Sequence, residues 1–213
     1  MATRTSYILL GSLLSLLYSC TKANNGSIPA VTCPSFSDPV FAEWFPYIKD
    51  QVSVYKNSST GANDTISIAT ASTSGNYTEH AVNFTADSCT ATATVVSKET
   101  VDTGGILKLF VYGYHSATGQ DSVTFYFYGF AFTSGKIADT GLNVKNLSAK
   151  INSATYVNYN FQGKTYSKVQ VITSNDTTGP SHDPPWIYKV FIAENAGVIG
   201  YENFPQRQVW ALQ

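Results

Sequence analysis

The most evident shortage in this 213-residue sequence is charge. Lysine, arginine, aspartate and glutamate make up only 13% of the residues, and the formal net charge is −1. That is about half of the charge that soluble domains usually carry. A protein that binds nucleic acid through phosphate contacts needs a basic patch, so the composition argues against a nucleic-acid partner.

Motifs of catalysis and metal binding are missing as well. The sequence contains no G-x-S-x-G elbow, no C-x-x-C pair and no glycine-rich phosphate loop after a predicted strand. Its three histidines, His80, His115 and His182, lie far apart, and none has metal-binding spacing. We therefore expect no enzyme, no cofactor and no metal site; a hydrolase that pairs His182 with a serine is the weaker alternative.

Aromatic residues are abundant at 14%, and Thr, Ser and Asn are frequent, while methionine occurs once. β-branched and aromatic side chains favour strands. Alternating segments separated by turn residues predict strands over 52–56, 64–71, 77–86, 90–97, 106–115, 121–132, 156–161, 164–173, 186–194, 197–202 and 207–212. Only residues 41–48 suggest a short helix. We expect an all-β fold with a single antiparallel domain, as a half-barrel, barrel or sandwich, with lipocalin-like and LolA-like folds as analogies.

The N-terminus has the pattern of a signal peptide over residues 1–19. Arg4 provides a thin basic region, and residues 8–17, ILLGSLLSLL, form an apolar stretch. This stretch is too short for a membrane span, which needs about 20 apolar residues. A buried core helix is the alternative interpretation.

The end of this stretch is more specific. Leu17-Tyr18-Ser19-Cys20 resembles a bacterial lipobox, in which an aliphatic residue, a tolerant position and a small residue precede a cysteine. The resemblance implies that Cys20 is acylated and anchors the mature chain to a membrane. Ordinary secretion is the alternative. Residues 20–39, rich in Asn, Ser and Pro, are then expected to form a flexible tether, and residues 40–213 the β domain.

The C-terminal half resembles uncharacterised lipoproteins of the Bacteroidota. The resemblance rests on GKTYSKVQVI (163–172), WIYKVFIAENAGVIGYE (186–202) and VWAL (209–212), and WFPYIKDQVSVYK (44–56) is similar to their opening segment although Tyr47 replaces the usual Leu. It implies an outer-membrane lipoprotein without an established activity. Because no acidic residue directly follows Cys20, the same resemblance implies that the protein faces the periplasm.

Two modifications can be predicted from the exported location. Cys33 and Cys89 remain after lipidation of Cys20 and are expected to form a disulfide, with two buried thiols as the alternative. Asp-Ser/Thr-hydrophobic triplets resemble O-glycosylation sites of Bacteroidota at Thr65, Ser122 and Thr177. Turn residues that enter strands explain these triplets equally well.

The predicted strands 106–115 and 121–132 are apolar on both faces, so both faces need cover. Two interpretations stay open: a hairpin within a filled core, or one face that lines an aromatic cavity for a lipophilic ligand or a sugar. The cavity interpretation assigns the lining to Phe110, Tyr112, Tyr114, Tyr126, Tyr128 and Phe130. Tyrosine hydroxyls need polar partners when buried, which favours a cavity.

Together these features predict a non-enzymatic, lipid-anchored binding module for a hydrophobic small molecule or lipid. A glycan-binding module and a structural or partner-docking module are the alternatives. Exposed aromatic rings on a platform would indicate a glycan, an enclosed aromatic cavity a lipophile, and a filled core with a free edge strand a docking partner.

Replacement of Cys20 tests the predicted anchor. We expect Cys20→Ala to abolish labelling by radioactive palmitate and to release the protein from the membrane fraction, because the thiol that accepts the acyl group is gone. Cys33→Ala is the matched control and should leave labelling intact. Unchanged labelling of Cys20→Ala would exclude the lipobox interpretation.

Overall fold

The structure of the chain is a computed structural model, and it describes residues 36–78, 88–101, 105–116, 121–135, 141–142, 144–145, 151–175 and 186–213. The predicted signal peptide, Cys20, Cys33, Thr177, His80 and His182 lie outside the described residues. In the part of the chain that is described, no helix is both long enough and apolar enough to cross a membrane.

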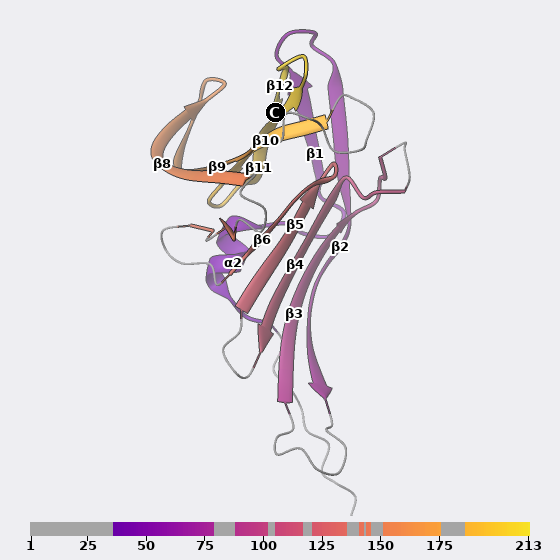
Figure 1. Ribbon diagram of the computed structural model, residues 1–213. Coiled ribbons are helices and arrows are strands. Elements are labelled where there is room, and N and C mark those ends of the chain that lie inside the picture. The colour runs from indigo at the N-terminus through magenta and orange to yellow at the C-terminus, as the bar shows by residue number, and fades with distance from the viewer. Residues whose placement is uncertain are drawn as a thin grey trace, which may run out of the picture. The chain divides into compact units, whose positions relative to one another are not determined.

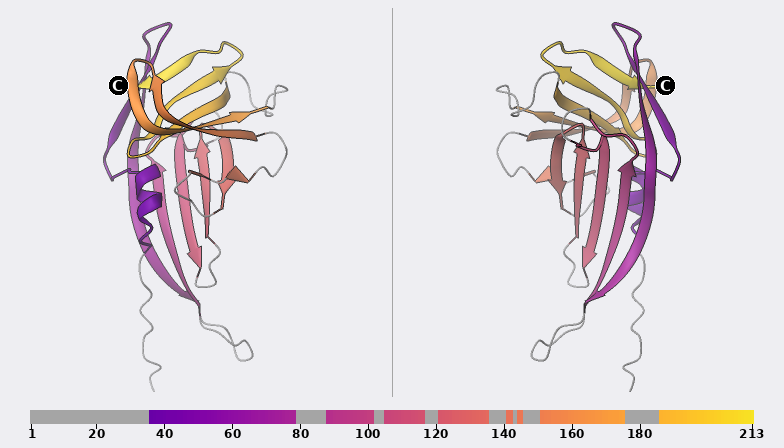
Figure 2. Two further views of the ribbon diagram at one scale, coloured as in Figure 1. Left: turned by 90° about the vertical axis from the view of Figure 1, so that its left-hand side faces the viewer. Right: turned by 90° about the vertical axis from the view of Figure 1, so that its right-hand side faces the viewer.

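The described residues form one twelve-stranded antiparallel sheet that curls into a nearly closed barrel (Figures 1 and 2). The strands are β1 (Val52–Asn57), β2 (Asn63–Thr78), β3 (Ser88–Ser97), β4 (Leu109–Ser116), β5 (Asp121–Phe127), β6 (Phe130–Ser134), β7 (Val144–Lys145), β8 (Ile151–Phe161), β9 (Lys164–Ser174), β10 (Trp186–Ala193), β11 (Gly197–Phe204) and β12 (Val209–Leu212). Their order is β7-β6-β5-β4-β3-β2-β1-β12-β11-β10-β9-β8. The prediction of a single antiparallel β domain is confirmed.

Pairing between β1 and β12 joins the two ends of the described chain. Tyr55 lies opposite Leu212 and Asn57 opposite Trp210. On one side of this junction the strands follow one another as a meander from β1 to β7, and on the other side from β12 back to β8. The sheet therefore consists of two meanders, β1 to β7 and β8 to β12, which are joined by the pairing of β1 with β12.

The predicted strand 121–132 is wrong in its extent. Residues 121–132 form two strands, β5 and β6, joined by a two-residue turn at Tyr128 and Gly129. Both turn residues have positive φ angles, 50° and 83°, as a tight hairpin turn requires. The turn was not predicted from the sequence, because a bulky aromatic residue such as Tyr128 rarely adopts the positive φ that this turn position requires. Since Phe127 pairs with Phe130 across the hairpin, Phe130 faces the same side as Phe127 and the opposite side from Tyr126.

The barrel interior is filled mainly by aromatic and aliphatic side chains. Phe125 and Phe127 are fully buried, and the ring centroids of Phe125 and Phe132 are 4.8 Å apart. A second cluster, built around Phe161, Phe191 and Ile199, is formed by the strands β8 to β12. Strand β10 belongs to both clusters, which explains its nearly continuous apolar sequence.

A buried glutamine fixes the segment that precedes β7. The Gln170 side chain, 2% exposed, accepts a hydrogen bond from the Leu142 amide at 2.7 Å and donates one to the Leu142 carbonyl at 2.6 Å. Its amide also donates to the Ser153 hydroxyl at 2.5 Å. The carboxamide therefore replaces a strand neighbour for Leu142 and satisfies polar groups that would otherwise be costly to bury.

A partly buried polar group is the Asp64 carboxylate, whose side chain is 16% exposed. Lys108 approaches one carboxylate oxygen at 2.8 Å, and the hydroxyls of Tyr201, at 2.8 Å, and of Tyr128 donate to the other. Burial, together with the neighbouring Asp64 charge, raises the pKa values of both tyrosines well above the usual value. Every oxygen of Asp64 has a partner, so we interpret this cluster as structural.

The raised tyrosine pKa values predict a loss of stability at alkaline pH. An unfolded chain releases these protons near the ordinary pKa of 10.0, whereas the folded protein keeps them. The stabilisation is therefore fully present below pH 10 and is lost as the pH rises above it, by about 1.4 kcal/mol per pH unit for each tyrosine. Urea denaturation between pH 9 and 11 measures this slope. It should flatten in Tyr128→Phe/Tyr201→Phe but not in the control Tyr112→Phe, which leaves the Asp64 contacts intact; an equal slope in the double variant would contradict the assignment.

Candidate functional site

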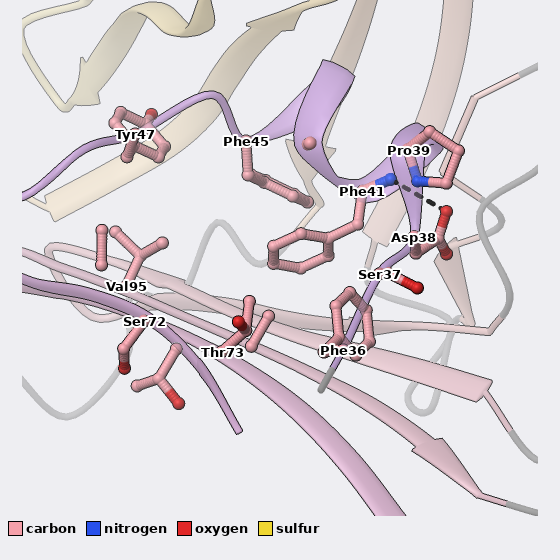
Figure 3. Close-up of a pocket in the computed structure, with 14 residues that line it drawn as sticks. Phe36, Ser37, Asp38, Pro39, Phe41, Phe45, Tyr47, Ser72, Thr73 and Val95 are labelled. Carbon is pink, nitrogen blue, oxygen red and sulfur yellow. Dashed lines mark hydrogen bonds between the residues drawn. The ribbon is translucent and has the colours of Figure 1, made fainter. Parts of the chain in front are cut away.

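The described residues line an open pocket of about 500 Å³ between the segment 36–47 and the middle part of the strands β2 and β3 (Figure 3). Aromatic rings from the segment form one wall, which we call the roof, and the strand residues form the opposite wall, the floor. The residues that line it are Phe36, Ser37, Asp38, Pro39, Phe41, Ala42, Phe45, Tyr47, Ala71, Ser72, Thr73, Ala93, Thr94 and Val95.

The roof is built around the short helix α2 (Pro39–Trp44), which lies against the sheet (Figure 2). Asp38 caps its N-terminus: the carboxylate oxygen Oδ1 accepts hydrogen bonds from the amides of Val40 at 2.9 Å and Phe41 at 3.3 Å. Pro39 occupies the first helical position, where no backbone donor is needed. The helix ends before Pro46, because a residue that precedes proline is disfavoured in the helical conformation. The predicted helix at 41–48 therefore exists but begins and ends earlier.

The far end of the roof is anchored to the β10–β11 hairpin. The buried Tyr47 hydroxyl accepts a hydrogen bond from the Val198 amide at 2.8 Å, and burial raises the pKa of Tyr47. The Asn195 amide donates to the Glu43 carbonyl at 2.6 Å. A Cβ atom at Gly197 would lie 2.6 Å from the Tyr47 hydroxyl oxygen, and Gly197 has a φ of +71°. Glycine at this turn therefore serves both the backbone conformation and the close approach of the roof.

The floor is made of small side chains on the inner faces of two strands. Ala71 pairs with Val95, and Thr73 pairs with Ala93. The neighbouring strand β4 has Gly113 opposite Ala93, and a Cβ atom at Gly113 would lie only 2.8 Å from a ring carbon of Phe41. The glycine lets the ring of Phe41 rest directly on the sheet, while the small residues beside it leave the open volume of the pocket.

The pocket surface is chiefly apolar and aromatic. Phe36 and Phe41 meet edge to face with ring centroids 5.1 Å apart, and Phe41 and Phe45 lie 5.2 Å apart. Polar groups come from Ser37, Asp38 and the hydroxyls of the floor. Such a surface can hold an apolar ligand and orient one polar group of it. Among the described residues, no three acidic, histidine or cysteine side chains come together as metal ligands would.

A histidine–aspartate pair lies beside the pocket. His115 Nδ1 and the Asp121 carboxylate are 2.5 Å apart, and both line a small cavity of about 10 Å³ that shares Phe36 and Asp38 with the pocket. A cavity of this size holds about one water molecule. The His115 side chain itself is 55% exposed, so this pair lies at the surface beside the pocket.

None of the six aromatic residues predicted to line a cavity lines this pocket. Phe110, Tyr112, Tyr114 and Tyr126 lie on the opposite face of the β4–β5 hairpin from the buried residues. The rings of Phe110 and Tyr112 are nearly parallel, 3° between planes, and Phe110 and Tyr126 lie 5.8 Å apart. The remaining two are elsewhere: Tyr128 binds Asp64, and Phe130 is buried in the core.

The structure also places the predicted modification residues. Thr65 is exposed on β2, and Ser122 is half-buried on β5. Cys89 on β3 is disulfide-bonded, and its partner lies outside the described residues. The predicted partner is Cys33.

Sequence inspection missed the roof because part of it falls within the segment expected to be a tether. Phe36 is buried, and Asp38 and Pro39 begin the helix. The signal was present: Asp-Pro is a helix start, and Phe41, Trp44 and Phe45 have the i, i+3, i+4 spacing of a helical apolar face.

No family model, no curated protein and no solved structure matches this chain. The likeness to Bacteroidota lipoproteins therefore remains an interpretation of the sequence, and the pocket has to be judged by its geometry.

The contact between Gly113 and Phe41 can be tested by a double-mutant cycle. We expect Gly113→Val to lower the free energy of unfolding by about 1–3 kcal/mol, because the added methyl groups displace the ring of Phe41. Gly113 has no positive φ, so backbone strain does not contribute. Urea denaturation should show a smaller cost of Gly113→Val when Phe41 is already Ala; equal costs in both backgrounds would show that the two residues are not coupled.

Proposed function

We propose that this domain is a non-enzymatic binding module for a hydrophobic small molecule or the hydrocarbon part of a lipid, carried by an envelope lipoprotein anchored through Cys20. The pocket under α2 supports this proposal most directly. Its volume of about 500 Å³ lies within the usual range of small-molecule sites, roughly 300–1,000 Å³.

The energetics fit a hydrocarbon ligand. Each CH₂ group that leaves water contributes about 0.8 kcal/mol, so a chain of several carbons against these rings offsets the entropic cost of association. The roof is held at both ends, by the Asp38 cap and by the Tyr47 contact with Val198. A wall that is fixed before binding lowers the ordering cost that a ligand must overcome.

The outer face of the β4–β5 hairpin supports a second candidate, a glycan-binding surface. Phe110, Tyr112 and Tyr126 form a group of neighbouring rings, and Tyr126 is 40% exposed. Tyr112 is paired with Thr94 on one side and Thr124 on the other, so hydroxyl groups flank the rings. Aromatic rings that border hydroxyl groups suit the apolar face and the hydroxyls of a sugar.

Filling the pocket tests the first candidate. We expect Ala71→Phe to reduce binding of the neutral dye Nile red at least about tenfold, because the new ring occupies space within the pocket. Thr70→Phe is the matched control, since Thr70 is the adjacent, exposed residue on the other face of β2 and does not line the pocket. Dye fluorescence titrations of the full chain measure both.

Unchanged binding in Ala71→Phe would contradict the proposal. Binding of a soluble oligosaccharide that survives Ala71→Phe but is lost in Tyr112→Ala would favour the outer face instead.

A further inference from the structure

The pocket under α2 has an uneven distribution of charge. Of its fourteen lining residues, one carries a carboxylate, Asp38, and none carries an amine or a guanidinium group. Three other lysines of the described residues are paired with carboxylates away from the pocket: Lys108 with Asp64, Lys168 with Glu194 and Lys189 with Glu202. Among the described residues, the pocket wall therefore offers no positive partner to a negatively charged ligand.

The position of the Asp38 carboxylate is fixed. Its Oδ1 atom accepts hydrogen bonds from two amides of the first helical turn, and the side chain lies at the rim between Phe36 and Pro39 (Figure 3). The small neighbouring cavity shares Asp38 and is also lined by His115 and the Asp121 carboxylate, which pair with each other. Negative charge thus lies at one end of a pocket whose other described lining residues are uncharged.

We infer that the pocket excludes anionic amphiphiles and takes hydrocarbon chains whose polar head is uncharged or cationic. This inference rests on the proposed function and names the ligand class for the same site. A carboxylate head that entered would lose water without gaining a counter-ion, and it would approach the like charge of the Asp38 carboxylate. An alcohol or ester head would instead meet the hydroxyls of Ser37 and Thr73 at no such cost.

Three ligands with the same ten-carbon chain test this inference: decan-1-ol, decanoate and decyltrimethylammonium. Each competes with Nile red for the full chain at pH 8, below the critical micelle concentrations. We expect decan-1-ol and decyltrimethylammonium to displace the dye at concentrations at least about tenfold lower than decanoate.

Replacement of Asp38 by asparagine assigns the effect to one group. Asn is as good a helix cap as Asp, so Asp38→Asn removes the charge and keeps the hydrogen bonds to α2. We expect decanoate to approach the affinity of decan-1-ol in this variant. Glu43→Gln is the matched control, because it removes an equal charge from an exposed position of α2 that does not line the pocket, and it should retain the discrimination.

The outcomes separate the inference from the function on which it rests. If none of the three ligands displaces the dye, the proposed function is wrong. If decanoate and decan-1-ol compete equally in the unmodified chain, the pocket binds hydrocarbon chains but the charge selection is wrong. If the discrimination persists in Asp38→Asn, the assignment to Asp38 is overturned.

Discussion

The pairing of β1 with β12 is the contact on which the rest of the described domain depends. It joins two meanders that are separate in the sequence, and it brings the β1 residue Tyr55 against the β10–β11 hairpin. The Tyr55 hydroxyl donates to the Val198 carbonyl at 2.9 Å, while the Val198 amide donates to Tyr47 at 2.8 Å. One residue of β11 therefore connects the central strand pair to the roof of the pocket.

The pocket exists because the barrel is filled unequally along its length. Large rings such as Phe125, Phe127 and Tyr201 pack in one region, where the centroids of Phe127 and Tyr201 are 5.3 Å apart. Near Ala71 and Ala93 the strand side chains are small, and the aromatic roof does not fill the remaining space. The polar side chains of the buried Gln170 and the partly buried Asp64 are both held by protein partners away from the pocket, so we interpret them as serving the fold.

The sequence predicted most strands within a few residues, because alternation and turn residues are local signals. It failed where the local signal was ambiguous. Residues 121–132 were predicted to form one strand, because the first turn position, 128, is a tyrosine. Glycine or asparagine usually occupies a turn position with positive φ, so Tyr128 gave no sign of the turn. The candidate site was missed for a related reason: Phe36 and Asp38 lie in a Ser- and Pro-rich stretch whose composition is typical of a tether.

The sequence by itself determined the class of the fold, since strands rich in β-branched and aromatic residues with short turns bury their apolar faces in antiparallel sheets. It left a half-barrel, a barrel and a sandwich open as the arrangement of these strands. The sequence did not determine which face of the β4–β5 hairpin is covered, because both faces are apolar. Alternation shows which residues share a face, but it does not show what packs against that face. Only the tertiary structure decided this. The segment 36–47 packs on the face of Gly113, far along the chain, and leaves Phe110, Tyr112 and Tyr126 on the other side. The contact depends on the absence of a side chain at position 113, which no local pattern of hydrophobicity records.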